Sequence, residues 1–152
     1  MSATSPPDGF DHGLPANRFN PHAWVVGEPI IGDGSWIGAF TVIDGSGGLE
    51  IGAGCDISSG VHIYTHSTVA RCISERRSDI ERAGSIIGAH VYVGANATIL
   101  MGASIGHHSV VAAGAVVLEH TSAPPYSLLV GAPARVVEGG ARKYAGSAAP
   151  GE

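Results

Sequence analysis

The sequence is poor in charged and aromatic side chains. Charged residues make up 14% of the 152, aromatic residues 6%, and Lys143 is the only lysine. With a net charge of −5 the chain has no basic surface for a nucleic acid, which we therefore do not expect as a partner. No apolar run approaches the ~20 residues of a membrane span, and the start lacks the pattern of a signal peptide. These absences predict a soluble cytoplasmic protein.

Cysteine is scarce as well. Cys55 and Cys72 are the only two, which is too few for a disulfide framework, and their spacing is not that of a zinc knuckle. Because aromatic side chains are few, the core has to be built from Ile, Val and Ala. The length suits one domain with a substantial core.

Glycine is abundant, at 23 residues, and it accompanies a six-residue repeat. Gly follows many repeat positions directly, where we expect it to relieve a corner with an unusual φ. A small or short residue stands two places before each late repeat. The repeat positions are all Ile or Val: 31, 37, 43, 51, 57, 63, 87, 93, 99, 105, 111 and 117.

A period of six fits one short strand followed by one tight corner. Three such units close a triangular coil, and coils stack through parallel strand pairing with Ile or Val inside. An amphipathic helix would repeat at three and four, and a β-sandwich would alternate at two between hairpin turns. A disordered Gly-rich chain would not keep its apolar residues in register. The repeat therefore predicts an all-β, parallel β-helix of about four to five coils.

Three segments interrupt the repeat. Residues 1–22 are polar and Pro-rich, and we expect a loose N-terminal arm there. Residues 45–48 add a small corner bulge. Between 63 and 87 the hexads fail because Glu75 and Glu81 occupy interior slots, so residues 65–84 should loop out. We therefore expect a β-helix domain over residues 23–137 and a polar tail over 138–152.

Three segments resemble the hexapeptide-repeat acyltransferases, and especially the small sugar acetyltransferases of surface-polysaccharide pathways. They are Ile63-Tyr64-Thr65-His66, the block from Ile86 to Val117, and Gly131-Ala132-Pro133-Ala134-Arg135-Val136-Val137. The resemblance implies a left-handed β-helix, although the general rule for crossovers is right-handed. It also implies a homotrimer with sites between subunits. The implied reaction is acetyl transfer from acetyl-CoA to a hydroxyl or amine of a sugar, with a nucleotide-linked sugar expected.

Acyl transfer from a thioester needs a base for the attacking hydroxyl or amine, and His suits that role near pH 7. His66 stands where the resembling enzymes have their catalytic His, at the mouth of the inserted loop. His62, four residues earlier, is a second candidate. Without the resemblance, His66 would be interpreted as a solvated loop residue. The pair His107-His108 is expected at a coil corner on the surface.

The resemblance also implies an acetyl-CoA site. Ala95 and Ala113 are one full coil apart, so their N–H groups should stack at one corner and meet the thioester carbonyl and the pantetheine arm. Ordinary corner alanines would fit the turn equally well. Tyr92 stands where the family often has a Trp beside the cofactor.

The terminal signature supplies the remaining cofactor contacts that the resemblance implies. Pro133 belongs to that signature, and Arg135 directly after it matches a contact to a coenzyme phosphate. The chain departs from the family at Glu119, where Lys is common, and at Glu138, where a second basic residue is replaced. Arg142 and Lys143 in the tail could substitute.

The inserted loop carries half of the basic residues. Arg binds phosphate in bidentate fashion, so we expect Arg71, Arg76 and Arg77, with Tyr64, to bind the acceptor and its diphosphate. The alternative is a short solvated helix in which acidic neighbours pair with these arginines.

Two other functions fit the fold. A γ-class carbonic anhydrase holds zinc with three His across subunits, but Asn96 and Met101 occupy the places of two of these ligands, so we expect no metal. The other is a non-catalytic trimeric scaffold. Coenzyme A binding and an effect of His66 on turnover would separate the three functions.

Overall fold

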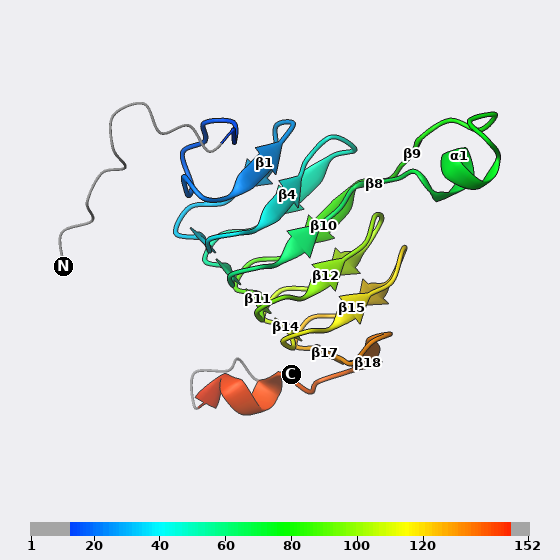
Figure 1. Cartoon of the computed structure of the whole chain (residues 1–152). Helices are drawn as coiled ribbons and strands as arrows, with labels where there is room; N and C mark the ends of the chain where they lie inside the picture. Colours follow the sequence, from blue (N-terminus) through cyan, green and yellow to red (C-terminus); the bar gives the residue numbers. More distant parts are fainter. Residues whose placement is uncertain (1–12, 147–152) are drawn as a thin grey trace.

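The computed structural model describes residues 13–146, and the repeat folds into the predicted left-handed parallel β-helix (Figure 1). The arm expected at 1–22 and the tail expected at 138–152 therefore lie partly outside the described residues. Five coils stack on one another, which is the upper end of the predicted range.

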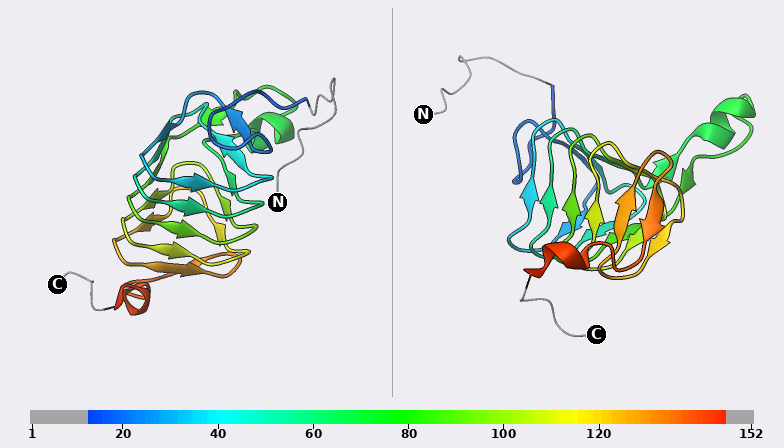
Figure 2. Two further views of the ribbon diagram at one scale, coloured as in Figure 1. Left: turned by 90° about the vertical axis from the view of Figure 1, so that its left-hand side faces the viewer. Right: turned by 90° about the horizontal axis from the view of Figure 1, so that it is seen from below.

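Each coil contributes one short strand to each of three parallel sheets (Figure 2). The first sheet consists of β1 (Trp24–Val26), β4 (Val42–Asp44), β7 (His62–Ile63), β12 (Thr98–Ile99) and β15 (Val116–Val117). The second consists of β2 (Ile30–Ile31), β5 (Leu49–Ile51), β10 (Ser85–Ile87), β13 (Ser104–Ile105) and β16 (Ser122–Ala123). The third consists of β3 (Trp36–Ile37), β6 (Asp56–Ile57), β11 (Tyr92–Val93), β14 (Val110–Val111), β17 (Leu128–Val130) and the antiparallel β18 (Arg135–Val137).

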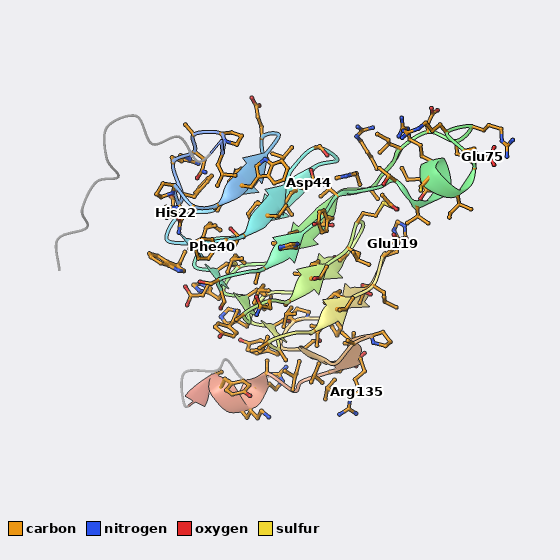
Figure 3. All side chains as sticks on the ribbon, viewed as in Figure 1. His22, Phe40, Asp44, Glu75, Glu119 and Arg135 are labelled. Atoms are coloured by element: carbon orange, nitrogen blue, oxygen red, sulfur yellow. The ribbon has the colours of Figure 1, made fainter. Side chains whose placement is uncertain are left out.

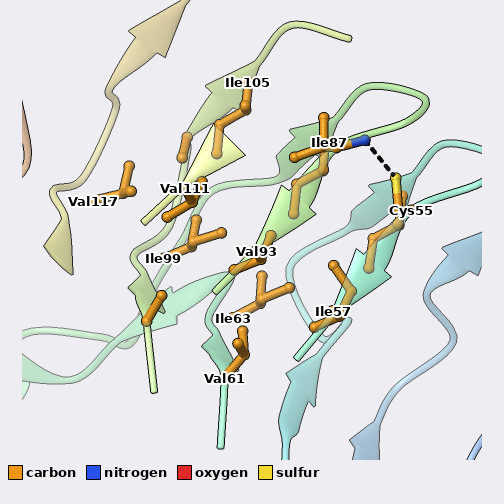
Figure 4. Close-up of a cluster of buried hydrophobic side chains, with 14 of the residues drawn as sticks. Cys55, Ile57, Val61, Ile63, Ile87, Val93, Ile99, Ile105, Val111 and Val117 are labelled. Carbon is orange, nitrogen blue, oxygen red and sulfur yellow. Dashed lines mark hydrogen bonds between the residues drawn. The ribbon is translucent and has the colours of Figure 1, made fainter. Parts of the chain in front are cut away.

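The core is a column of branched side chains inside the coil (Figure 4). All twelve predicted interior positions are buried, and so are the small or short residues two places before the late repeats. Strands pair in register, for example Ile43 beside Ile63 and Ile63 beside Ile99. Each interior side chain therefore packs on its equivalents in the coils above and below.

Three corners join the sheets, and we name them the 1–2, 2–3 and 3–1 corners after the sheets they connect. Most corners place one residue in the left-handed region, with φ between 55° and 75°. These residues stand three places before the next interior residue, and they include His90, Asn96 and Gly102. A single left-handed residue turns the chain sharply enough to start the next sheet.

The predicted reason for the Gly that directly follows an interior residue is wrong. Gly38 and Gly88 are not in the left-handed region, and the unusual φ falls two residues later. A Cβ at Gly38 would lie 2.7 Å from Ser59 N, and one at Gly88 would lie 2.5 Å from His107 N. These positions need Gly because the backbone of the next coil passes too close for a side chain.

The inserted loop leaves the coil at the 1–2 corner after β7. It rises on a two-stranded antiparallel stalk of β8 (His66–Ser67) and β9 (Glu81–Arg82) and carries α1 (Val69–Ile73) at its tip, away from the coils (Figure 1). A short 3-10 helix, η1 (Arg142–Tyr144), lies at the other end of the stack. Among residues 13–146, no helix has the length and apolar character needed to cross a membrane.

Neighbouring isoleucines provide a test of this core. Ile87 is 1% exposed inside the coil, whereas Ile86 is 51% exposed on the outer face of the same strand. Ile87→Ala should lower the free energy of unfolding by about 2–5 kcal/mol because it leaves a cavity. Ile86→Ala should change it by about 0.5 kcal/mol or less. Urea unfolding of both variants measures the difference, and equal losses would contradict the inside–outside assignment.

Candidate functional site

The root of the inserted loop holds a histidine and a carboxylate in direct contact. His66 Nδ1 lies 2.5 Å from Asp44 Oδ2. Asp44 comes from the end of β4, one coil above His66, and its side chain is 2% exposed, while that of His66 is 35% exposed. Figure 3 shows Asp44 beside the stalk from which the loop projects. A buried carboxylate thus orients a ring that solvent can reach.

Asp44 is held by the bulge that follows it. Its Oδ1 accepts a hydrogen bond from Ser46 N–H at 2.9 Å, and its Oδ2 accepts one from Thr65 N–H at 2.9 Å. Burial alone would raise the pKa of Asp44, but hydrogen bonds from Ser46, Thr65 and His66 outweigh burial and hold that pKa well below its usual range. Asp44 is therefore a carboxylate, so Nδ1 of His66 carries the proton that it donates. In the neutral ring the lone pair is then on Nε2.

Two further predicted residues stand beside His66. The Tyr64 ring lies edge-on between the rings of His62 and His66, with centroids 5.9 and 6.1 Å away. The Tyr64 hydroxyl lies 3.1 Å from His62 Nδ1. The structure therefore brings His62, Tyr64 and His66 together in one row across the 1–2 corner.

Ala95 and Ala113 stack at a different edge, the 3–1 corner. Both are exposed, and Ala95 O accepts a hydrogen bond from Gly114 N–H at 2.9 Å, which locks the two coils in register. Within residues 13–146, neither Ala95 N–H nor Ala113 N–H donates to a protein acceptor. Two unpaired donors therefore lie one coil apart, a spacing of about 4.8 Å.

Other predicted cofactor residues lie on the same side of the coil. Arg135 is exposed at the start of β18, opposite Val130, at the far end of the stack from Asp44 (Figure 3). Pro133 is exposed in the turn before it, and Ala134 N–H donates to Val116 O at 2.8 Å. This turn extends the 3–1 corner by one level below Ala113.

The outer face of the third sheet carries an apolar hollow. It has a volume of 450 Å³, and it is lined by Tyr92, Val110, Ala112, Leu128 and Tyr144. Tyr92, which we predicted beside the cofactor, lines this hollow. Lys143 lies at its edge, with Nζ 5.1 Å from the centre of the Tyr144 ring.

The loop arginines divide into two groups. Arg71 and Arg76 line a hollow of 410 Å³ together with Thr68, Cys72 and Glu75. Arg77 is exposed outside that lining. No carboxylate lies within ion-pair distance of any of these arginines in the part of the chain that the structure describes. The helix of the alternative interpretation exists as α1, but the ion pairs that it would require do not.

One chain does not bring all the predicted site residues together. His62, Tyr64 and His66 lie at the 1–2 corner, and Ala95, Ala113 and Arg135 lie at the 3–1 corner. The width of the first sheet separates the two groups. In the described residues no three His, Cys, Asp or Glu side chains lie close enough to hold a metal ion.

Sequence reasoning missed Asp44. Asp44 follows an interior Ile and directly precedes the bulge at 45–48, and this position could have indicated a functional carboxylate. The bulge was interpreted only as an insertion, whereas its amides bind Asp44 and Thr65: Gly47 N–H donates to Thr65 Oγ1 at 2.8 Å. Gly47 has no room for a side chain because a Cβ there would collide with Thr65 O.

Comparison with known proteins agrees with the fold. The sequence matches the family described as the hexapeptide repeat of succinyl-transferase over residues 30–65 and 85–119. It is 32% identical over 135 residues to the carnitine operon protein CaiE of Salmonella agona (strain SL483). That match covers 86% of this chain but only 64% of CaiE.

Two solved structures are similar throughout the coil. One is AntD, an N-acyltransferase from Bacillus cereus in complex with dTDP and 3-hydroxybutyryl-CoA, with a TM-score of 0.68 and 25% identity over 80% of this chain and 68% of AntD. The other is the hexapeptide-repeat acetyltransferase VCA0836 from Vibrio cholerae, with a TM-score of 0.64 and 32% identity over 72% of this chain and 61% of that one. VCA0836 has also been solved with acetyl coenzyme A.

Fold and corner geometry define a left-handed β-helix of the type that acyltransferases use. The repeats that match the family model, over residues 30–65 and 85–119, are the ones that form this coil.

The contacts of Asp44 yield a pH-dependent test. Asp44→Asn should lower the free energy of unfolding at pH 7 by about 1–3 kcal/mol, because an amide cannot accept all these hydrogen bonds. Since folding lowers the pKa of Asp44, its stabilisation is complete above the usual value of 3.8 and is lost as the pH falls below it. Urea unfolding should therefore show the variant and wild type converging in acid.

The control for this test is Asp56→Asn, on an exposed strand position of the same coil, which should leave stability unchanged. A gap between Asp44→Asn and wild type that is as large in acid as at pH 7 would contradict an ionised Asp44.

Proposed function

We propose that the protein is a cytoplasmic acetyltransferase that moves an acetyl group from acetyl-CoA to a hydroxyl or amine of a sugar. The observation that carries this proposal is the Asp44–His66 pair, a buried carboxylate that orients a solvent-accessible imidazole at the mouth of a loop. The likeness to N-acyltransferase and acetyltransferase structures supports it.

The chemistry follows from the free nitrogen of His66. Nε2 takes the proton of the acceptor hydroxyl or amine as its oxygen or nitrogen attacks the thioester carbonyl. Asp44 stabilises the imidazolium that forms and keeps the ring in place. The C–S bond then breaks, the acetyl group remains on the acceptor, and the coenzyme thiolate accepts the proton from His66.

The 3–1 corner supplies what the thioester needs. The unpaired N–H groups of Ala95 and Ala113 are fixed backbone donors for the carbonyl and the pantetheine amides, and such donors favour a developing oxyanion. The apolar hollow beside Tyr92 fits the pantetheine arm, and Arg135 at the end of the stack fits a phosphate. Because Glu119 stands where Lys is common in the family, Arg135 and Lys143 are the cationic side chains that would bind the coenzyme phosphates.

The acceptor would lie at the loop. Arg71 and Arg76 line a hollow in which Glu75 makes no ion pair with either of them, so both guanidinium groups can bind the diphosphate of a nucleotide-linked sugar. A second hollow of 290 Å³ on the second sheet presents Glu50 beside Ile30 and Ile86. A carboxylate can accept hydrogen bonds from the hydroxyl groups of a sugar, and apolar side chains beside it can pack against the sugar ring. AntD has been solved with dTDP-4-amino-4,6-dideoxyglucose and coenzyme A, which supports this acceptor class.

Because the two halves of the site lie at different corners, we propose that neighbouring copies complete it in a homotrimer. If the 1–2 corner of one copy meets the 3–1 corner of the next, three copies place their first sheets around a common axis. The outward row of the first sheet is Trp24, Val42, His62, Thr98 and Val116. It contains no Asp, Glu, Lys or Arg, whereas the same row carries Glu50 in the second sheet and Asp56 in the third. Depletion of charge is typical of an interface core.

Loss of the base is the first test of the proposed reaction. His66→Ala should reduce thiol release from acetyl-CoA by ~10²–10⁴ with a nucleotide-linked amino or deoxy sugar as acceptor. His120→Asn removes an exposed histidine two coils further along the same corner and suits its φ of 58°, so it should leave turnover unchanged. Thiol release that depends on a sugar and persists in His66→Ala would contradict the assigned base. The absence of turnover with every sugar of a broad panel would contradict the proposed reaction.

Subunit mixing tests where the site lies. His66→Ala removes the base, and Ala113→Gln places a long side chain over the coenzyme corner, so each variant alone should be inactive. If sites form between copies, random 1:1 mixed trimers should recover about a quarter of the wild-type sites, since the two intact corners come from different chains. Co-refolding and the thiol assay measure this. Zero recovery in mixed trimers that mass spectrometry confirms would place the site within one chain.

A further inference from the structure

Three histidines and a tyrosine gather at the 2–3 corner, to which we have assigned no role so far. His90, His108 and Tyr126 occupy the same left-handed slot in successive coils, with φ of 55°, 57° and 62°. Their rings therefore stack along the coil axis, with 5.0 Å between His90 and His108 and 5.0 Å between His108 and Tyr126. His107 stands beside the stack, with its Nδ1 2.9 Å from that of His108.

This arrangement limits the positive charge that the rings can carry. Two imidazole nitrogens at 2.9 Å need one N–H and one lone pair between them, so His107 and His108 cannot both be charged without breaking the contact. Loss of hydration lowers the pKa of His108, and the neighbouring His107 and His90 lower it further. Acid would place positive charges on rings that lie about 5 Å apart, where like charges repel.

The C-terminal segment 141–145, which we term the strap, contains η1 and packs against Tyr126 at the end of this stack (Figure 2). Ala141 is 3% exposed, and its N–H donates to Tyr126 O at 2.9 Å. The Arg142 guanidinium lies 4.5 Å from the centre of the Tyr126 ring. Tyr126 thus contacts Arg142 and His108, and protonation of His108 would give that ring a second cationic neighbour. Lys143 and Tyr144 are the remaining titratable groups of the strap.

Closure of the strap has a cost. Tyr126 is 5% exposed, and its hydroxyl is buried without a hydrogen-bond partner in the described part of the chain. A buried hydroxyl that loses water without a new partner is unfavourable. Opening the strap would return this hydroxyl to water, which reduces the free-energy difference between the closed and open positions.

The strap also forms part of the proposed coenzyme site. Tyr144 lines the 450 Å³ hollow with Tyr92, and it lines a smaller hollow of 190 Å³ with His90 and His108. Movement of the strap would therefore remove one wall of the hollow that we assign to the pantetheine arm.

We propose that the strap is a pH-sensitive lid: neutral imidazoles at His90, His107 and His108 keep it closed, and mild acid opens it and weakens coenzyme binding. The link to the coenzyme rests on the proposed function, whereas the opening does not. Because the closed state lowers the pKa of His108, the stability that this gives the closed state is complete above the ordinary His pKa of about 6.5 and is lost as the pH falls below that value.

Hydrogen exchange of the strap amides tests the opening directly. After correction for intrinsic rates, protection over 141–145 should fall by about tenfold or more between pH 8 and pH 5.5, while β10 and β11 stay protected. His90→Asn with His108→Asn should abolish this pH dependence, since Asn accepts a left-handed φ. His120→Asn is the matched control, with φ of 58° at the 1–2 corner, and should behave like wild type.

Two further measurements complete the test. Tyr126→Phe removes the unpaired hydroxyl and should raise strap protection about tenfold at pH 8. The Kd of coenzyme A should rise in acid for wild type but not for the double Asn variant. Strap protection independent of pH, or a pH dependence that His120→Asn also abolishes, would overturn the lid. Normal strap opening without coenzyme binding at either pH would instead refute the proposed function.

Discussion

The whole molecule depends on the close stacking of one coil on the next. Parallel pairing sets the distance between coils, and a Gly after the interior residue lets the backbones approach to within contact, as at Gly38 and Gly88. Because the interior Ile and Val side chains are in register from coil to coil, every corner repeats at the same place. Side chains eighteen residues apart therefore become neighbours, and each corner becomes a column.

The three columns have separate chemistries. The 1–2 corner carries the bulge that fixes Asp44 and the loop root that presents His66 to solvent. The 3–1 corner offers unpaired backbone donors at Ala95 and Ala113 above Arg135. The 2–3 corner stacks His90, His108 and Tyr126 under the strap. The prism keeps the 1–2 and 3–1 columns apart, which is why we propose that two copies of the chain complete the site.

The regular part of the structure could be predicted from the sequence because one rule generates it. The spacing of Ile31, Ile37 and their equivalents predicted the coil, and the hexads that fail around Glu75 and Glu81 predicted the loop. Position in the loop, with the family resemblance, selected His66. Asp44 could not be selected in the same way, because its role depends on the fold of the bulge, which brings Ser46 N–H and Thr65 N–H to one carboxylate. The packing of the strap could not be predicted from the sequence, because Arg142 contacts Tyr126 only once the coil has formed.

The central claim is that acetyl-CoA lies along the 3–1 corner of one copy and faces the His66 of the next. Backbone amide NMR of ¹⁵N-labelled protein during a coenzyme A titration tests it most directly. We expect the largest shifts at the Ala95 and Ala113 amides, smaller shifts at Arg135, and line broadening of His66 from the adjoining copy. Shifts confined to the second sheet, with Ala95 and Ala113 unmoved, would contradict it.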